Sequence, residues 1–251
     1  MNEFELFLFD LDGTLTESRS DLDEEMAELL NKLLENKKVA VISGAGFTQF
    51  KKQFIDKLPT NTNLNNLFIA PLTGGSLYKF DGNDWEKIYE DTLSDIEKNN
   101  IIKALEKAVA ENNFLRPEKI FGKQIQDREG QITFSVLGDE APLEIKKVWD
   151  PDIEKRKELK NILDKDLPEF EVSVGGSTSI DIRKKGIDKA YGIEKISFIL
   201  KIPIEKIVFI GDAIFEGGND YSAIKTGAST QKVSGPEETR TFLNKYLEKK
   251  Y

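Results

Sequence analysis

The sequence predicts an α/β protein in which a Rossmann-like parallel-sheet core is interrupted by an inserted α+β domain. At both ends of the chain, short apolar strands alternate with amphipathic helices, a pattern typical of a parallel sheet covered by helices. Between them, hairpin signals replace this alternation. The 251 residues allow one or two domains, and a hydrophobic fraction of 39% is enough for a sizeable core.

The first part of the chain follows the alternating pattern. The apolar run 4–9 predicts a buried strand, and Asp23 begins a helix whose apolar residues recur on one face. A β-branched strand is expected over 39–42, a helix over 47–58 and another strand over 67–70. These elements predict the first half of the parallel sheet.

The middle of the chain is expected to form hairpins mixed with helices, which favours an α+β module. The three turns contain Asp81-Gly82-Asn83, Arg128-Glu129-Gly130 and Gly175-Gly176. We place the inserted domain at residues 83–185. The hairpins are expected over 77–80 and 85–89, 124–127 and 131–137, and 171–174 and 179–183, with helices over 94–112 and 152–166.

After the insertion the first pattern returns. A helix is expected over 188–200, a strand over 207–210 and a final helix over 236–249. The core domain is therefore expected to be discontinuous, formed by residues 1–82 and 186–251.

The composition excludes several classes of function. The chain has no His and no Cys, so Ser-His-Asp triads, Cys nucleophiles and Cys/His zinc sites are impossible. A metal must bind to oxygen ligands, which suits Mg²⁺. The net charge of −9 argues against nucleic acid as a partner, and no apolar run is long enough for a membrane span. We expect a cytoplasmic protein.

An acidic motif follows the first predicted strand. Asp10 ends the apolar run, Asp12 lies two positions later, and Gly13 permits a tight turn. Active sites of doubly wound sheets form at the carboxyl ends of strands. Asp10 is a candidate nucleophile or metal ligand, and Asp12 is a candidate acid/base. The alternative is a turn without a catalytic role.

The run Phe-Asp-Leu-Asp-Gly-Thr-Leu-Thr at residues 9–16 resembles the first motif of the haloacid dehalogenase superfamily of phosphotransferases. The resemblance implies an aspartyl-phosphate on Asp10. It implies phosphate binding by Ser43 with the backbone of Gly44, and by Lys189, which would pair with Asp10. The plainer interpretations are a strand-end serine and a solvated lysine on a helix.

A second acidic motif consists of Gly211-Asp212 followed by Gly217-Gly218-Asn219-Asp220. It resembles the metal-binding motif of the same superfamily. The resemblance implies that Asp212 binds Mg²⁺ together with Asp10 and the carbonyl of Asp12. Asn219 and Asp220 would support these ligands without binding the ion themselves. The alternative is a glycine-rich turn in which Asp220 caps a helix. The inserted domain lies where the superfamily carries its α+β cap, which selects the substrate.

Within the superfamily, the chain resembles the eukaryotic-type phosphomannomutases over nearly its whole length. Arg19 and Arg128 match arginines that bind the substrate phosphate in that family, and exposed surface arginines are the alternative. Residues 175–181 resemble its Gly-Gly-x-x-Ser-x-Asp motif. This implies that Ser179 binds phosphate and Asp181 a sugar hydroxyl.

The sequence departs from the mutase pattern at several positions. Asp139 replaces an arginine, and a carboxylate there would repel phosphate. Lys146 lies near a further mutase arginine and keeps its charge as a substrate-binding candidate. Thr73-Gly74-Gly75 replaces Glu-Asn-Gly, and the second cation loop is poorly matched around 223–227.

The resemblance implies an Mg²⁺-dependent phosphosugar phosphotransferase that interconverts mannose 6-phosphate and mannose 1-phosphate. A sugar bisphosphate would be its activator, and its place would be in GDP-mannose biosynthesis. The alternative is a sugar-phosphate phosphatase, in which water accepts the phosphoryl group. A third hypothesis is a catalytically inactive binding protein. The partner is expected to be a small phosphosugar, not nucleic acid or a membrane, and the mutase resemblance suggests a homodimer through the cap.

Overall fold

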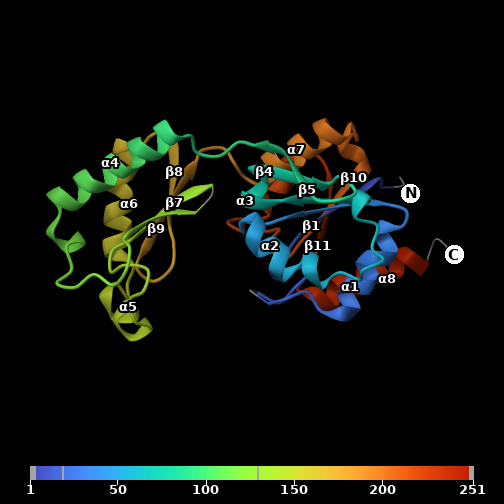
Figure 1. The fold of residues 1–251 in the computed structure, drawn as a ribbon, viewed down its shortest axis with the longest axis horizontal. Coiled ribbons are helices and arrows are strands. Elements are labelled where there is room, and N and C mark those ends of the chain that lie inside the picture. Colours follow the sequence, from blue (N-terminus) through green and yellow to red (C-terminus); the bar gives the residue numbers. More distant parts are fainter. Residues whose placement is uncertain (1–3, 19, 129, 249–251) are drawn as a thin grey trace. The chain divides into compact units, whose positions relative to one another are not determined.

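The computed structural model describes residues 4–18, 20–128 and 130–248 (Figure 1). The described chain divides into two compact units, one formed by the residues up to Asp91 and from Ile187 onward, the other by Thr92–Gly186. The expected insertion is thus present, but its first boundary at residue 83 is wrong. The strand β5 (Trp85–Glu90) pairs with β4 (Ser76–Phe80) in the sheet of the core unit, so the insertion begins at residue 92.

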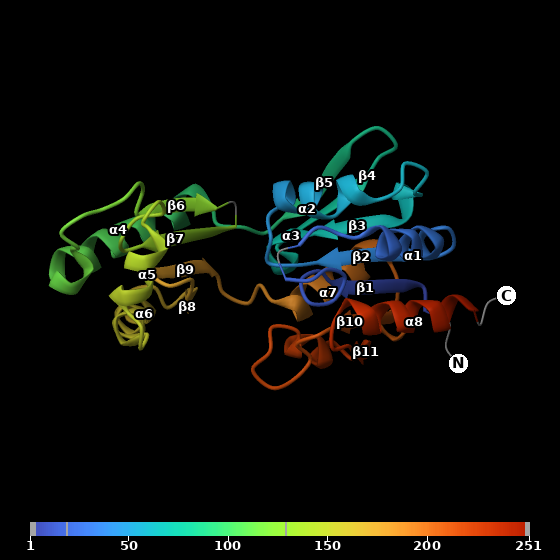
Figure 2. The same ribbon diagram turned by 90° about the horizontal axis from the view of Figure 1, so that it is seen from below.

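In the described residues, the core unit is built on a seven-stranded sheet with the order β11-β10-β1-β2-β3-β4-β5. The first five strands are mutually parallel, and the β4–β5 hairpin extends the sheet in antiparallel fashion. Figure 2 shows β10, β1, β2 and β3 side by side. The parallel strands are β1 (Leu6–Asp10), β2 (Lys38–Ile42), β3 (Leu67–Ala70), β10 (Ile207–Gly211) and β11 (Ser229–Lys232).

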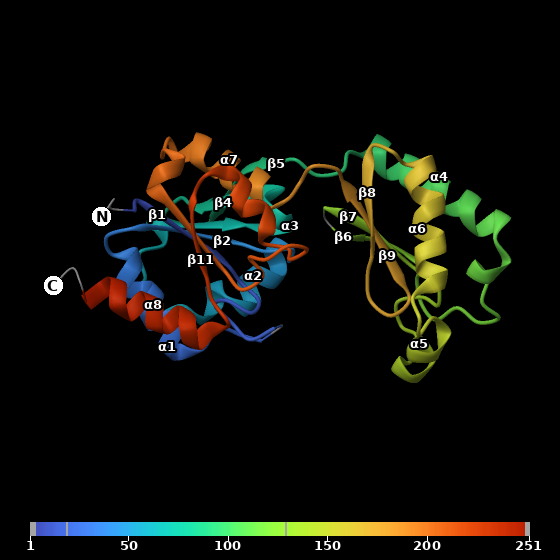
Figure 3. The ribbon, with the colours of Figure 1, turned by 180° about the vertical axis from the view of Figure 1, so that it is seen from behind.

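Helices cover both faces of this sheet, which explains why its central strands are apolar throughout. In β1, Phe7 and Phe9 pack into the cluster beneath α1 and α8, whereas Leu6 and Leu8 pack into the cluster beneath α7. Figure 3 shows α7 on one side of the sheet and α1 and α8 on the other. The helices are α1 (Glu24–Leu34), α2 (Phe47–Gln53), α3 (Pro71–Gly74), α7 (Lys189–Leu200) and α8 (Pro236–Glu248).

Three local expectations differ from the structure. The helix expected over 47–58 ends at Gln53 and continues as a 3₁₀ turn over Ile55–Lys57. The edge strand β11 was not expected, because its residues are polar and mostly exposed. The helix α5 (Leu143–Trp149) was also missed, since it buries none of its side chains.

The inserted unit contains a four-stranded antiparallel sheet among its described residues, with the order β6-β7-β9-β8. The helices α4 (Asp95–Glu111) and α6 (Glu154–Asp166) pack on its apolar face (Figures 1 and 3). On the other face, register aligns Gln126, Thr133, Asp181 and Ser173 in one row. The strands are β6 (Ile125–Arg128), β7 (Gln131–Ser135), β8 (Phe170–Val174) and β9 (Ser179–Lys184).

Among the residues described, no helix combines the length and the apolar character needed to cross a bilayer.

Candidate active site

The acidic residues of the sequence motifs meet at the carboxyl end of the central strands. Asp10 is the last residue of β1, Ser43 follows β2, and Asp212 follows β10. Because β10, β1 and β2 are parallel neighbours, their carboxyl ends lie at one edge of the sheet. The topology therefore assembles a site from segments about two hundred residues apart in the chain.

Lys189 lies between two of these carboxylates. It is the first residue of α7 and is 1% exposed, and its Nζ lies 2.5 Å from Asp10 Oδ1 and also bonds Asp220 Oδ1. Asp10 is 3% exposed and Asp220 is fully buried. Asp220 Oδ2 accepts a hydrogen bond of 3.0 Å from the backbone N–H of Ala213. The expected pairing of Lys189 with Asp10 is thus present.

Three carboxylates of the described residues converge beside this lysine. One oxygen from each of Asp10, Asp212 and Asp220 lies within 4.8 Å of the others. Lys189 brings a single positive charge, so the cluster keeps an excess of negative charge when all three are ionised. A divalent cation with oxygen ligands neutralises such an excess, and these hard donors fit Mg²⁺.

Two glycines leave room for the carboxylates. A Cβ on Gly13, whose φ is +81°, would lie 2.7 Å from Asp212 Oδ2. A Cβ on Gly211 would collide with Asp220 Oδ2. Thr14 donates a long hydrogen bond of 3.5 Å to Asp212 Oδ1. The glycines of both motifs are therefore required by the close approach of the acids.

Burial raises the pKa of Asp10 from 3.8 to about 7. The Lys189 ammonium opposes this shift, while the neighbouring Asp220 and Asp212 carboxylates add to it. Burial also lowers the pKa of Lys189, but Asp10 and Asp220 outweigh burial, so that pKa lies above its usual value. Without a further cation, Asp10 therefore takes up a proton near neutral pH.

Asp12 has a partner that the sequence did not reveal. Gln53, at the end of α2 and 5% exposed, donates from Nε2 to Asp12 Oδ1 at 3.2 Å and to Thr16 Oγ1 at 3.4 Å. Its Oε1 accepts from Gln49 Nε2 at 3.2 Å, which fixes the amide orientation. Gln53 thus orients Asp12 from a segment 41 positions away.

Ser43 is buried, and its Oγ accepts a hydrogen bond of 3.2 Å from the N–H of Ala45. A Cβ on Gly44 would make only ordinary contact, at 3.8 Å from Thr73 Oγ1. Asn219 is exposed. The phosphate-binding roles of Ser43 and Gly44 and the supporting role of Asn219 stay predictions. Asp220 belongs to the carboxylate cluster and binds Lys189 and the N–H of Ala213, and its supporting role also stays a prediction.

In the inserted unit, three sequence candidates lie on the polar face of the sheet. Ser179 and Asp181 are two residues apart on β9, and Arg128 lies at the end of β6. Thr133 donates to Asp181 Oδ1 at 2.7 Å. Arg128 Nε donates to Gln126 Oε1 at 3.0 Å. Arg19 lies outside the described residues.

The carboxylate of Asp139 has a local structural role. Its Oδ1 accepts from the N–H of Lys123 at 2.7 Å, and its Oδ2 accepts from Gln126 Nε2 at 2.6 Å. Asp139 therefore orients Gln126, which in turn holds Arg128. Lys146 Nζ donates to the backbone carbonyl of Asp139 at 2.9 Å, so its expected substrate contact stays a prediction.

A model of haloacid dehalogenase-like hydrolases matches residues 7–227. The chain belongs to this family. Phosphomannomutase 2 of Dictyostelium discoideum is 27% identical over 99% of this chain and 99% of that protein. The phosphomannomutase of Spinacia oleracea is 28% identical over 92% of this chain and 91% of that protein.

Two solved structures share the fold of this chain. Truncated, IMP-bound Plasmodium falciparum IMP-nucleotidase has a TM-score of 0.63 at 20% identity, covering 98% of this chain and 68% of its own. Aspergillus fumigatus trehalose-6-phosphate phosphatase has a TM-score of 0.60 at 16% identity, and the match covers 97% of this chain and 92% of that chain. The expected α/β fold with an inserted domain is therefore confirmed.

Mg²⁺ affinity is predicted to depend on pH through Asp10. Because its pKa is raised to about 7, a proton competes with the cation below that pH. The apparent affinity should fall about tenfold between pH 8 and pH 6. Calorimetric titration with MgCl₂ at both values measures this change. Asp10→Asn, which cannot titrate, serves as the control, and equal affinities of the unsubstituted protein at both pH values would contradict the assignment.

Proposed function

We propose that the chain is an Mg²⁺-dependent phosphosugar phosphotransferase, a phosphomannomutase that interconverts mannose 6-phosphate and mannose 1-phosphate. The observation that carries the proposal is the buried Asp10, paired with Lys189 and flanked by two further carboxylates. We infer that the sugar is mannose from the names of relatives that match nearly the whole chain.

Asp10 is the nucleophile of the proposed reaction. One of its carboxylate oxygens attacks the phosphorus of a sugar bisphosphate, forming an aspartyl-phosphate while the bond from phosphorus to the sugar oxygen breaks. Lys189 donates to Asp10 Oδ1 and so keeps the carboxylate oriented. Its positive charge partly offsets the charge of the phosphoryl group. Ser43 and the backbone of Gly44 bind that phosphoryl group.

Asp12 moves the proton. It protonates the sugar oxygen that leaves. In the second step it takes the proton from the hydroxyl at the other position of a sugar monophosphate as that hydroxyl attacks the aspartyl-phosphate. The net result is transfer of a phosphoryl group from one sugar position to the other. The hydrogen bond from Gln53 holds the Asp12 carboxylate in place for both steps.

The proposed metal site comprises the carboxylates of Asp10 and Asp212 and the carbonyl of Asp12. Bound Mg²⁺ would neutralise charge as an anionic substrate meets an anionic nucleophile. Asp220 holds Lys189 beside this site and accepts from the loop after β10. Asn219 is assigned a supporting role in the same loop.

The inserted unit is proposed to bind the second phosphate and the sugar. Arg128 and Ser179 bind phosphate, and Asp181 accepts from a sugar hydroxyl. Arg19 and Lys146 belong to the same proposed set. The proposal further includes a cytoplasmic enzyme of GDP-mannose biosynthesis, a sugar bisphosphate activator, and a homodimer formed through the inserted unit.

A sugar-phosphate phosphatase is the second candidate. In that reaction water attacks the aspartyl-phosphate and inorganic phosphate leaves. The observation that favours it is Asp139, which stands where the mutases carry an arginine. Its carboxylate accepts hydrogen bonds from Lys123 and Gln126. If the second phosphate binds more weakly, the sugar occupies the site less often, and water can attack the aspartyl-phosphate in its place.

Mannose 1-phosphate distinguishes the two reactions. Incubated with MgCl₂ and a catalytic amount of mannose 1,6-bisphosphate, the protein is expected to yield mannose 6-phosphate without matching inorganic phosphate. Asp10→Asn removes the nucleophile while keeping the shape of the side chain, so it should abolish turnover without unfolding the protein. Stoichiometric phosphate release would defeat the mutase in favour of the phosphatase.

Gln53 provides a test of the Asp12 assignment. Gln53→Leu removes the hydrogen bond to Asp12 at similar volume, and turnover should fall about tenfold because the acid/base is no longer oriented. Gln49→Leu, which removes only the bond that orients Gln53, should cause a smaller loss. Steady-state kinetics measure both variants, and full turnover in Gln53→Leu would refute the orienting role.

A further inference from the structure

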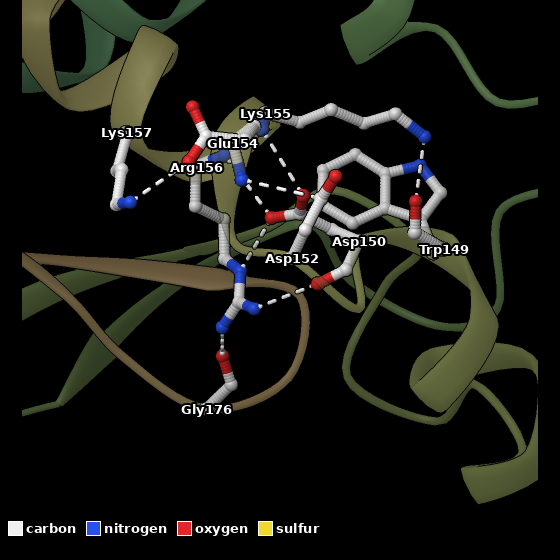
Figure 4. Close-up of polar contacts among 8 residues, drawn as sticks. All are labelled: Trp149, Asp150, Asp152, Glu154, Lys155, Arg156, Lys157 and Gly176. Atoms are coloured by element: carbon white, nitrogen blue, oxygen red, sulfur yellow. Dashed lines mark hydrogen bonds and ion pairs between the residues drawn. The ribbon is translucent and has the colours of Figure 1, made fainter.

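A charged pair is buried in the inserted unit near the turn between β8 and β9. Arg156, on α6, is 7% exposed, and Asp150, just before that helix, is 2% exposed. Arg156 Nε donates to Asp150 Oδ2 at 2.8 Å, and Nη2 donates to the backbone carbonyl of Asp150 at 3.0 Å (Figure 4). The guanidinium is therefore held at two of its nitrogens by one residue.

The carboxylate of Asp150 is itself held by the start of α6. Its Oδ1 accepts from the N–H of Lys155 at 3.0 Å, and its Oδ2 accepts from the N–H of Arg156 at 3.1 Å. Burial raises the pKa of Asp150, but the Arg156 guanidinium and these N–H groups outweigh burial and hold that pKa below its usual value. The pair is thus ionised and fixed to the backbone.

The loop between the two residues is strained. Ile153 has a φ of +67°, a left-handed conformation that is rare for a β-branched residue. Such strain persists only where surrounding contacts fix the backbone. The hydrogen bonds that the N–H groups of Lys155 and Arg156 donate to Asp150 provide that restraint.

The third nitrogen of the guanidinium reaches the substrate-binding motif. Arg156 Nη1 donates to the carbonyl oxygen of Gly176 (Figure 4). Gly176 lies in the turn that joins β8 to β9, where the N–H of Gly175 donates to the carbonyl of Ser179 at 2.9 Å. The buried pair therefore anchors this turn to α6.

The anchored turn lies against two proposed substrate ligands. A Cβ on Gly175 would lie 2.7 Å from Ser179 Oγ and 2.8 Å from Asp181 Oδ2. A movement of the turn by about 1 Å would thus change the space beside both side chains, and displacements of that size are costly in binding sites.

We propose that Arg156, fixed by Asp150, is a positioning residue that holds the Gly175–Gly176 turn in place beside Ser179 and Asp181. Through this turn, Arg156 determines the affinity for the phosphosugar. This inference rests on the proposed function for the identity of the ligand. Arg156 acts through the turn and touches no substrate. The competing explanation is that Arg156 only stabilises the fold of the inserted unit, as a structural brace without influence on the turn. This explanation makes different predictions.

Arg156→Lys tests the positioning role, because lysine keeps the charge but cannot make the three bonds together. The KM for mannose 1-phosphate should rise about tenfold with kcat nearly unchanged. Hydrolysis of p-nitrophenyl phosphate, which is too small to need Ser179 and Asp181, should keep its rate. Arg116→Lys is the matched control, since Arg116 also donates to backbone carbonyls in this unit, and it should change neither reaction.

A brace alone would lower both reactions in proportion to the fraction unfolded, without changing the KM. Such a parallel loss, or an unchanged KM in Arg156→Lys, overturns the proposal. If Arg156→Lys folds poorly, the double variant Asp150→Asn/Arg156→Met removes both charges together and is measured in the same way.

Hydrogen exchange separates this inference from the proposed function. The amides of residues 175–179 should exchange faster in Arg156→Lys than in the unsubstituted protein, while those of β7 stay unchanged. This holds whether or not the protein accepts mannose phosphates. Unchanged exchange in the turn refutes the anchoring, whereas a wild-type protein inactive on mannose phosphates refutes only the choice of sugar.

Discussion

The contact of the Lys189 ammonium with Asp10 and Asp220 is the interaction on which the site depends. Buried charges of one sign are unfavourable without partners, and the lysine compensates only part of this cluster. Burial, together with the neighbouring carboxylates of Asp220 and Asp212, raises the pKa of Asp10. The excess negative charge of the cluster also favours binding of a cation. The adjacent parallel strands β10, β1 and β2 bring these groups to one sheet edge, and glycines in both acidic motifs admit them.

The two compact units divide the proposed work. The core unit carries the carboxylates, the lysine and Gln53, to which we assign the transfer of the phosphoryl group. The inserted unit carries hydroxyl, carboxylate and guanidinium groups on one face of its sheet, a set that suits a sugar phosphate rather than an apolar ligand. In this unit, Asp139 accepts a hydrogen bond from Gln126, and Gln126 accepts one from Arg128. Arg156 donates to the carbonyl of Gly176 in the turn between β8 and β9.

Much of the fold and the core of the site could be predicted, because their signals are local. The apolar run that stops at Asp10 indicates both a buried strand and its chemically active end. The hairpin containing β5 was also evident, but no local pattern tells which of two sheets it joins, so the domain boundary was misplaced. The roles of Gln53 and Asp139 depend on hydrogen bonds between distant segments and could not be predicted from the sequence.

Trapping the phosphorylated protein tests the central claim most directly. After brief mixing with sugar bisphosphate and MgCl₂, acid quenching and mass spectrometry of the peptides should find one phosphoryl group on Asp10. Chelation of Mg²⁺ before mixing should remove it. Phosphate on another residue, or equal labelling without Mg²⁺, would contradict a cation-dependent nucleophile at the end of β1.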